Sequence, residues 1–193
     1  MREKASRGYG NESGKGGGTI IYFRADNLII RSMLESDIEK LVEGFAEQNW
    51  HKPYELFYEY YRQQEDNEKS VIIAEISRNV AGYVTLCPYA KEGPFADRKI
   101  PEIVDFNVLI KYQKRGVGSK IMDVAEGLAK EKSEYVSLGV GLHSGYGSAQ
   151  RMYVKRGYIP DGTGVWYKGK QLEEYAQCEN DDDLVLYLFK FIC

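Results

Sequence analysis

The chain has 193 residues, of which 43% are hydrophobic and 28% are charged, so it can bury one sizeable core and its length is nearer to one domain than to two. Its net charge of -3, with no sustained basic face, argues against a nucleic-acid binder or a protein that docks on anionic membranes, and it favours small-molecule partners. No apolar run approaches the roughly 20 residues that cross a bilayer.

The cysteines argue against a secreted, disulfide-bonded protein, and the histidines argue against a metal site. Cys87, Cys178 and Cys193 are odd in number and lack C-x-x-C spacing, and the start MREKASRGYG has no apolar signal core. We therefore expect a cytoplasmic protein with reduced thiols. Because His51 and His143 have no ligand-spaced partner, we expect no metal site.

The first 18 residues are rich in glycine, serine and charge, and they include GNESGKGGGT. The spacing does not fit a phosphate loop, because Tyr9 stands where that motif needs a glycine and Gly16 stands where it needs Ser or Thr. Composition predicts a disordered tail or a cloning remnant over 1–18, and a single domain over 19–193.

The ordered part is predicted to begin with the short apolar strand NLIIRSM (27–33). A helix over 35–49 follows, with Ser36 as its cap. A second helix follows Pro53, which suits a first helical turn. The apolar positions that recur at helical spacing are Ile38, Leu41, Val42 and Phe45 in the first helix, and Tyr54, Phe57, Tyr58 and Tyr61 in the second.

The aromatic stripe of the second helix has two interpretations. It packs in the core, as such stripes usually do, or part of it walls a substrate pocket together with Trp50 and His51. Both can hold at once.

The middle of the chain alternates strands with helices. SVIIAEI (70–76) and VAGYVTLCP (80–88), separated by SRN, predict an antiparallel hairpin. KIPEIVDFNVLI (99–110) is long and β-branched enough for a central strand, and QKRGVGSKIM (113–122) leads from it into an amphipathic helix. The remaining predicted elements are the strand EYVSLGVGL (134–142), the helix SAQRMYVKRG (148–157), a strand that starts at YIP (158–160), and the strand LVLYLFKF (184–191).

This order predicts a mixed α/β fold in which helices cover both faces of a sheet. The glycine turn lies at the carboxyl end of the long strand, where open α/β sheets bind their ligands. A glycine-rich turn that opens a helix is either a tight connection or a place where backbone amides approach a phosphate closely.

Two sequence motifs decide between these alternatives. VLIKYQKRGVGSKIM resembles the pyrophosphate-binding motif of the GCN5-related N-acetyltransferase (GNAT) family, a strand valine followed by Gln or Arg and two glycines. AQRMYVKRGY resembles the second signature of that family, which marks its last helix. The matching positions are Val108, Gln113, Gly116 and Gly118 in the first motif, and Ala149, Tyr153, Gly157 and Tyr158 in the second.

The resemblance covers nearly the whole chain from Asn27 and implies a mostly antiparallel mixed sheet that splays at its centre. It also implies acetyl-CoA as cosubstrate, with its pantetheine arm along the long strand and its pyrophosphate on the amides of the glycine turn. The residues that it assigns to this cosubstrate are Val108, Ile110, Gln113, Lys114, Arg115, Gly116, Val117, Gly118, Ser119, Ser148 and Ala149.

The reaction implied is direct transfer of an acetyl group to an amine, which must first lose a proton because an alkyl ammonium has a pKa of about 10.4. Glu102 stands where some family members carry a base, and Asp105 is the alternative because a bulge would change which side chains face the cleft. A backbone N–H near Val108 would polarise the thioester carbonyl. Tyr153 matches the family tyrosine that protonates the leaving thiolate.

Two departures concern the edges of the site. Tyr146 stands where the second signature often has an asparagine, which puts the cosubstrate contacts at that corner in doubt. The stretch from Pro160 to Asp183 is long and could overhang the acceptor, with Trp166 and Tyr167 lining the site, or it could be a surface excursion.

The favoured function is N-acetylation of a primary amine of a small molecule. The alternatives are a protein acetyltransferase that acts on an N-terminus or a lysine, and a protein that binds acetyl-CoA without turnover. The assembly state is open, with a homodimer as one alternative.

Overall fold

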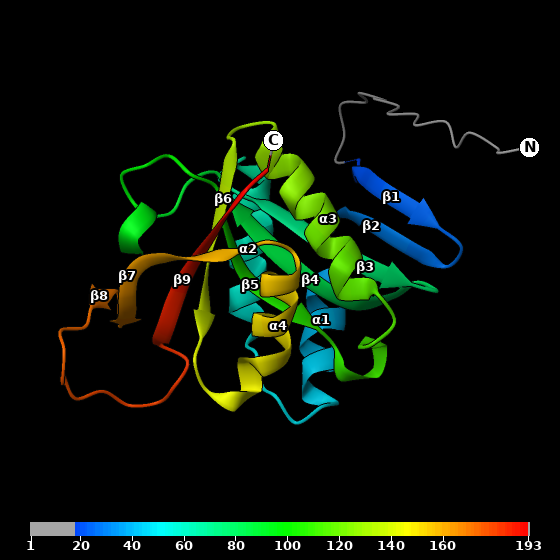
Figure 1. Cartoon of the computed structure of the whole chain (residues 1–193). Helices are drawn as coiled ribbons and strands as arrows, with labels where there is room; N and C mark the ends of the chain where they lie inside the picture. Colours follow the sequence, from blue (N-terminus) through cyan, green and yellow to red (C-terminus); the bar gives the residue numbers. More distant parts are fainter. Residues whose placement is uncertain (1–17, 193) are drawn as a thin grey trace, which may run out of the picture.

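The computed structural model describes residues 18–192, which form one nine-stranded sheet with α-helices on both faces (Figure 1). The strands are β1 (Ile21–Ala25), β2 (Leu28–Ser32), β3 (Ser70–Ile76), β4 (Asn79–Cys87), β5 (Glu102–Val108), β6 (Tyr135–Gly141), β7 (Ile159–Tyr167), β8 (Lys170–Gln171) and β9 (Leu184–Phe191). They lie in the order β1-β2-β3-β4-β5-β6-β9-β7-β8. Neighbours are antiparallel except β5 and β6, which run parallel, so the predicted mixed and mostly antiparallel sheet is confirmed.

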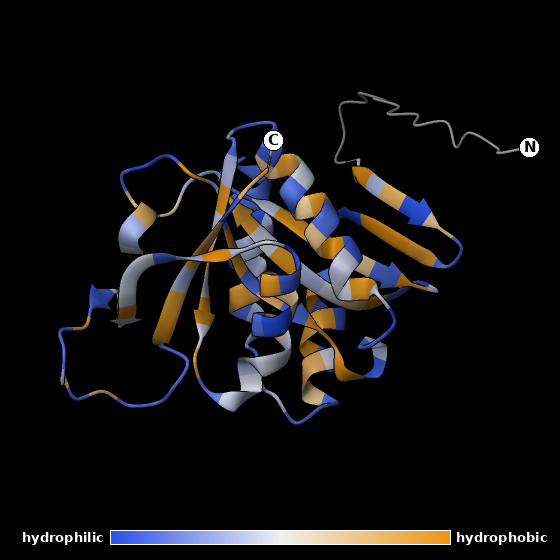
Figure 2. Ribbon diagram, in the orientation of Figure 1, coloured by the Kyte–Doolittle hydropathy of each residue, from blue (hydrophilic) through white to orange (hydrophobic). Residues whose placement is uncertain are grey.

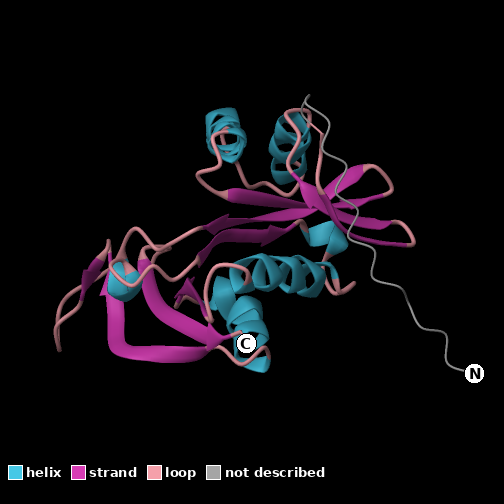
Figure 3. Ribbon diagram, turned by 90° about the horizontal axis from the view of Figure 1, so that it is seen from above, coloured by secondary structure: helices cyan, strands magenta, loops and turns pink. Residues whose placement is uncertain are grey.

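Helices lie on both faces of this sheet, as predicted (Figure 3). One face carries α1 (Asp37–Ala46) and α2 (Tyr54–Glu65), and the other carries α3 (Val117–Lys130) and α4 (Gly147–Lys155). The two faces follow from the alternation along each strand. In β3, Val71 and Ile73 pack toward α1 and α2, whereas Ile72 and Ala74 pack toward α3.

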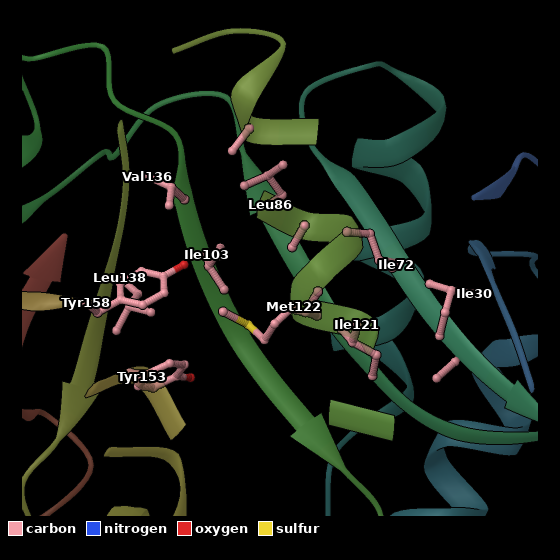
Figure 4. Packing of buried hydrophobic residues seen from close by; sticks show 14 of the residues in the cluster. Ile30, Ile72, Leu86, Ile103, Ile121, Met122, Val136, Leu138, Tyr153 and Tyr158 are labelled. Carbon is pink, nitrogen blue, oxygen red and sulfur yellow. The ribbon is translucent and has the colours of Figure 1, made fainter. Parts of the chain in front are cut away.

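The larger core lies between the sheet and α3 (Figure 4). Ile121 and Met122 of α3 are fully buried, and they contact a surface formed by side chains such as Ile72, Leu86 and Ile103. The start of α3, where the glycine turn lies, rests on the end of β5, because the Cβ position of Gly118 lies 3.4 Å from a Val108 methyl.

The start of the chain differs from the prediction. A strand, β1, precedes the predicted first strand and pairs with β2 through a turn in which Asp26 has a φ of 49°. It was missed because Ile21 is exposed at the sheet edge and its alternation is therefore weak. The predicted tail over 1–18 lies, apart from Gly18, outside the described residues.

The first two helices also differ in detail. Ser36 occupies the cap position of α1 but makes no capping hydrogen bond; the Asp37 carboxylate accepts the Leu34 N–H instead, at 2.9 Å. Within the aromatic stripe of α2 only Phe57 is fully buried, while Tyr54 and Tyr58 are each 43% exposed.

The long connection after α4 is more regular than predicted. β7 continues to Tyr167 and turns into β8, so Trp166 and Tyr167 lie on a strand, and only residues 172–183 form an irregular, hydrophilic connection (Figure 2). Trp166 packs against Tyr187 with ring centroids 5.6 Å apart. Its ring therefore belongs to a small aromatic cluster.

No helix in residues 18–192 is long and apolar enough to cross a membrane. Of the cysteines that the structure describes, Cys87 is buried and Cys178 is exposed, and both are free thiols.

Candidate active site

The candidate site lies where β5 and β6 diverge. The parallel pairing between them covers only Glu102 and Ile103 of β5. Just beyond, β5 carries a bulge, because Asp105 and Phe106 lie opposite the single residue Val84 of β4, and Asp105 has a left-handed φ of 49°. Beyond Ile103, β5 and β6 are therefore no longer paired, and each has an open edge where it faces the other.

The Val108 amide faces this opening. The Leu109 N–H donates to the Ala81 carbonyl of β4 at 3.0 Å, and successive amides of an extended strand point to opposite sides, so the Val108 N–H points away from β4. It is thus placed to donate to a carbonyl oxygen between the strands, as the sequence predicts.

The glycine turn presents a run of free amides. Gly116 is the N-cap residue of α3 with a φ of 78°, and Lys114 is left-handed too, at 60°. None of the hydrogen bonds in the described chain has an amide of residues 114–119 as its donor. A Cβ on Gly116 would meet no atom within 4 Å, so the glycine is needed for its backbone conformation and for what binds above it. These amides, at the positive end of a helix dipole, fit a pyrophosphate.

A cavity of about 300 Å³ adjoins this turn, between α3 and α4. Ser119 and Ser148, both predicted to contact the cosubstrate, lie in its wall. Arg151 and Lys155 lie there too and were missed. A signal for them was available in the sequence: they are four residues apart on one helix, just after Ser148. This spacing places both cations on one face of the helix, where they can bind an anion together.

The other predicted cosubstrate residues lie around the turn. Gln113 donates from its side-chain amide to the Val108 carbonyl at 2.9 Å, which closes the β5–α3 connection. Ile110 lies beyond the strand end, and its N–H already donates to the Gln48 side chain at 2.9 Å, so it is poorly placed to pair with a pantetheine arm. Ala149 is half-buried against the core, and Arg115 is exposed.

Glu102 is a half-buried carboxylate at the point where the strands part. It pairs with Cys87 of β4 and Ser137 of β6, and residues 88–101 cover this side of the sheet. Burial, and next the charge of Glu92, raise the pKa of Glu102 to about 7. Burial and then the Glu102 charge raise the pKa of Tyr187 to about 12. A carboxylate that titrates near neutrality can accept a proton from an amine and release it again.

Asp105 is already fully engaged. Its carboxylate accepts hydrogen bonds from the Lys52 ammonium at 2.7 and 2.9 Å, from the Tyr60 hydroxyl at 3.0 Å and from the Tyr83 hydroxyl at 2.5 Å. The Asn107 side chain donates to it at 2.8 Å. With its lone pairs taken up by four side chains, Asp105 is a poorer base candidate than Glu102. Lys52 is a residue that sequence reasoning missed, because an isolated lysine before a proline carries no signal.

Tyr153 lies on α4 and is 5% exposed. Its ring packs edge-on against Tyr158, 5.7 Å between centroids, and its hydroxyl lies on the side of the ring that faces β5 (Figure 4). Burial, and next the nearby Tyr146, raise the pKa of Tyr153, so it holds its proton at any ordinary pH. A phenol that keeps its proton can donate it, or donate a hydrogen bond, but cannot act as a base.

Tyr146, which replaces the expected asparagine, is bound at the end of β6. Its hydroxyl donates to Asp182 at 2.9 Å, and its ring packs against His143, 4.7 Å between centroids. A Cβ on Gly141 would lie 2.3 Å from this ring, so the glycine is required for the packing. Tyr146 thereby ties the β6–α4 connection to the segment before β9.

Comparison with known proteins identifies the family of this chain. The family model described as the acetyltransferase (GNAT) family matches residues 36–158, which is more than half of the chain. The chain belongs to this family. The match includes β5, the glycine turn and α4, so the predicted resemblance is confirmed, and the family indicates acyl transfer that uses acetyl-CoA.

Solved GNAT structures share the fold at low identity. Ard1 from Thermoplasma volcanium has a TM-score of 0.62 at 19% identity, covering 87% of this chain and 99% of that one. The yncA protein from Salmonella typhimurium, solved with acetyl-CoA, has a TM-score of 0.63 at 14% identity, covering 87% and 95%. A chimera of the spermidine N-acetyltransferase SpeG from Vibrio cholerae and hSSAT has a TM-score of 0.60 at 15% identity, covering 86% and 96%. No curated protein sequence matches the chain significantly.

Proposed function

We propose that this protein is an acetyl-CoA-dependent N-acetyltransferase that acts on the primary amine of a small molecule. The observation that carries the proposal is the position of Glu102, a carboxylate with a pKa of about 7 at the opening between β5 and β6. A protein that only binds acetyl-CoA has no need of such a base beside the thioester position.

The chain supplies three functions for the transfer. Glu102 removes a proton from the alkyl ammonium and leaves a nucleophilic amine. The amine attacks the thioester carbonyl, while the Val108 N–H donates a hydrogen bond to the oxygen on which negative charge develops. When the tetrahedral intermediate collapses, the carbon–sulfur bond breaks and Tyr153 gives its proton to the departing sulfur. The second proton of the attacking nitrogen then restores the Tyr153 hydroxyl, and the products are a neutral amide and a free thiol.

Residues of the glycine turn and of the adjoining cavity would hold the cosubstrate. The amides of 114–119 suit its pyrophosphate, and Arg151 and Lys155 suit a further phosphate group. Bound in this way, the cosubstrate supplies the activated acetyl group, and its other contacts serve to orient that group.

The enclosure of Glu102 favours a small acceptor. Residues 88–101 lie over this side of the sheet, with Phe95 packed 6.4 Å from the Tyr187 ring. Glu92 reaches the β7–β8 turn, where its Oε2 lies 3.1 Å from the Cβ position of Gly169. An acceptor that reaches Glu102 from this face must pass a covered edge, which suits a compact amine better than a folded protein. With its free thiols at Cys87 and Cys178, the enzyme is proposed to work in the cytoplasm.

An amine panel assayed by thiol release tests the proposal. Amino acids, polyamines, aminoglycosides, N-terminal peptides and lysine peptides are each incubated with acetyl-CoA and the full chain. We expect free thiol to form in proportion to an acetylated small amine identified by mass. Turnover confined to the peptides would favour a protein acceptor. Tight binding of acetyl-CoA with no turnover on any amine would contradict the enzymatic function.

A further inference from the structure

Lys52 lies in the connection between α1 and α2 and reaches under the sheet to the bulge of β5. Its ammonium donates to both oxygens of Asp105 and, at 2.8 Å, to the Tyr83 hydroxyl. It also lies 5.2–5.4 Å from the ring centroids of Phe45, Trp50 and Tyr83. The Lys52 side chain is only 11% exposed, so this is an enclosed cation with an aromatic wall and one carboxylate partner.

The bulge at Asp105 needs such a partner. A left-handed φ at a residue other than glycine costs of the order of 1 kcal/mol or more and persists where the surroundings enforce it. Here the backbone of Asp105 is left-handed and its side chain is held from three elements: the α1–α2 connection by Lys52, α2 by Tyr60 and β4 by Tyr83. No other non-glycine residue within a strand of the described chain has a positive φ.

The bulge also positions residues that pack on the opposite face of the sheet, toward α3. Phe106 and Val108 follow it directly, and the Cβ position of Gly118 lies 3.0 Å from the Phe106 ring and 3.4 Å from a Val108 methyl. The first turn of α3 therefore rests on the two residues that the bulge displaces. Any shift of Asp105 moves the Val108 amide and the free amides of the glycine turn relative to Glu102, which lies before the bulge.

We propose that Lys52 is a positioning residue: through Asp105 it holds the β5 bulge, and so sets the Val108 amide and the start of α3 at their working distance from Glu102. It acts through Asp105 and touches neither substrate. The effect of Lys52 on turnover rests on the proposed function, whereas its effect on the β5 backbone does not. The two are measured separately.

The experiment compares Lys52→Met with Lys52→Arg and with a matched control, Lys190→Met. Lys190 likewise pairs with a part-buried carboxylate, Glu126, at 2.6 Å and lies 5.7 Å from a tyrosine ring, and its removal leaves that carboxylate bound to Arg156. Tyr60→Phe removes one weaker donor to Asp105 and serves as a milder variant if Lys52→Met does not fold. The readouts are amide hydrogen exchange of residues 104–119 by mass spectrometry, and kcat and KM for both substrates.

Lys52→Met should raise hydrogen exchange over 104–110 about tenfold or more relative to the rest of the chain, and Tyr60→Phe should do so less. It should lower kcat by about 10- to 100-fold, since misplacements near 1 Å have effects of this size, with the KM for acetyl-CoA changed less. Lys52→Arg should restore most of both. Unchanged hydrogen exchange over 104–110 in Lys52→Met would overturn the proposal. So would a rise that is spread equally over the chain and matches the rise in Lys190→Met. Neither outcome depends on finding an acceptor. Altered exchange with normal kcat would overturn the positioning role alone.

Discussion

The two faces of the sheet build their parts of the candidate site in different ways. On the α3–α4 face the groups come from two short stretches, 108–119 and 148–155, and most are backbone amides or residues of one helix. On the α1–α2 face, the groups come from three separate elements: Lys52 from the α1–α2 connection, Glu102 and Asp105 from β5, and Tyr187 from β9. A phosphate is recognised by the backbone of a local turn, whereas proton transfer needs side chains that strand register brings together. Sequence motifs therefore predict the site residues on the α3–α4 face, but they do not predict how the side chains on the α1–α2 face come together.

The largest expected effect tests whether the α3–α4 face also takes part in the chemistry. Tyr153→Phe deletes only a hydroxyl and should lower kcat by about 10²- to 10⁴-fold, the range typical of a positioned acid, with acetyl-CoA affinity nearly unchanged. Steady-state kinetics and calorimetry measure the two quantities.

Tyr158→Phe is the matched control for this variant, because its ring is also buried and packs on that of Tyr153. It should leave kcat within about threefold of the parent. Equal losses in both variants would mean that the packing of the two rings matters and that Tyr153 is not the acid.

The second effect concerns cosubstrate binding on the same face. Gly116→Val forces a β-branched residue into a φ of 78° and places methyl groups above the free amides, so acetyl-CoA affinity should fall by about 100-fold or more. Calorimetry on the folded variant measures this. Gly127→Ala, at an exposed glycine within the same helix, should bind acetyl-CoA normally. Normal binding by Gly116→Val would remove the phosphate site from this turn.

The smallest effect concerns stability on the α1–α2 face. The folded-state pKa of Glu102, about 7, exceeds its ordinary value of 4.5, so the folded state binds this proton more tightly than the unfolded state does. The stability that this supplies is complete below 4.5 and is lost as the pH rises through 7. Glu102→Gln, which stays neutral, should therefore raise the Tm relative to the parent more at pH 8 than at pH 5, by about 2–4 °C per kcal/mol at this chain length. Thermal melts at both pH values check this, and an equal difference at the two would contradict a raised pKa.

Much of the fold followed from local patterns. The hairpin of β3 and β4, the helix after Gly116 and the last strand were predicted because their apolar patterns are strong. The helix carries one apolar stripe, and the strands are apolar runs that are packed on both faces. β1 and the continuation of β7 beyond Pro160 were not predicted, since strands with few buried side chains lose the alternation that marks a strand. Ser36 shows another limit, because it occupies the cap position without a capping hydrogen bond, and the Asp37 and Ile38 amides donate to backbone carbonyls instead.

In the candidate site, too, residues in local motifs could be predicted from the sequence, whereas contacts between distant residues could not. Ser119 and Ser148 line the cavity beside the glycine turn, and Tyr153 lies on the same helix as Ser148. Sequence reasoning could not separate Glu102 from Asp105, because the difference lies in the burial of one carboxylate and in the donors that surround the other. Two of those donors, Tyr60 and Lys52, lie 45 and 53 positions before Asp105 in the sequence, and no local pattern contains them.

The pH dependence of kcat/KM in the parent and in Glu102→Gln tests the central claim most directly. We expect kcat/KM of the parent to rise with pH and to level off above about 7, the pKa of Glu102. Glu102→Gln should lack this limb, be slower by about 10²-fold or more at neutral pH, and recover in part at higher pH as the amine loses its proton unaided. Asp105→Asn should keep the limb. The same ascending limb in Glu102→Gln as in the parent would contradict the role of Glu102 as the base, since the group that titrates near 7 would then not be Glu102.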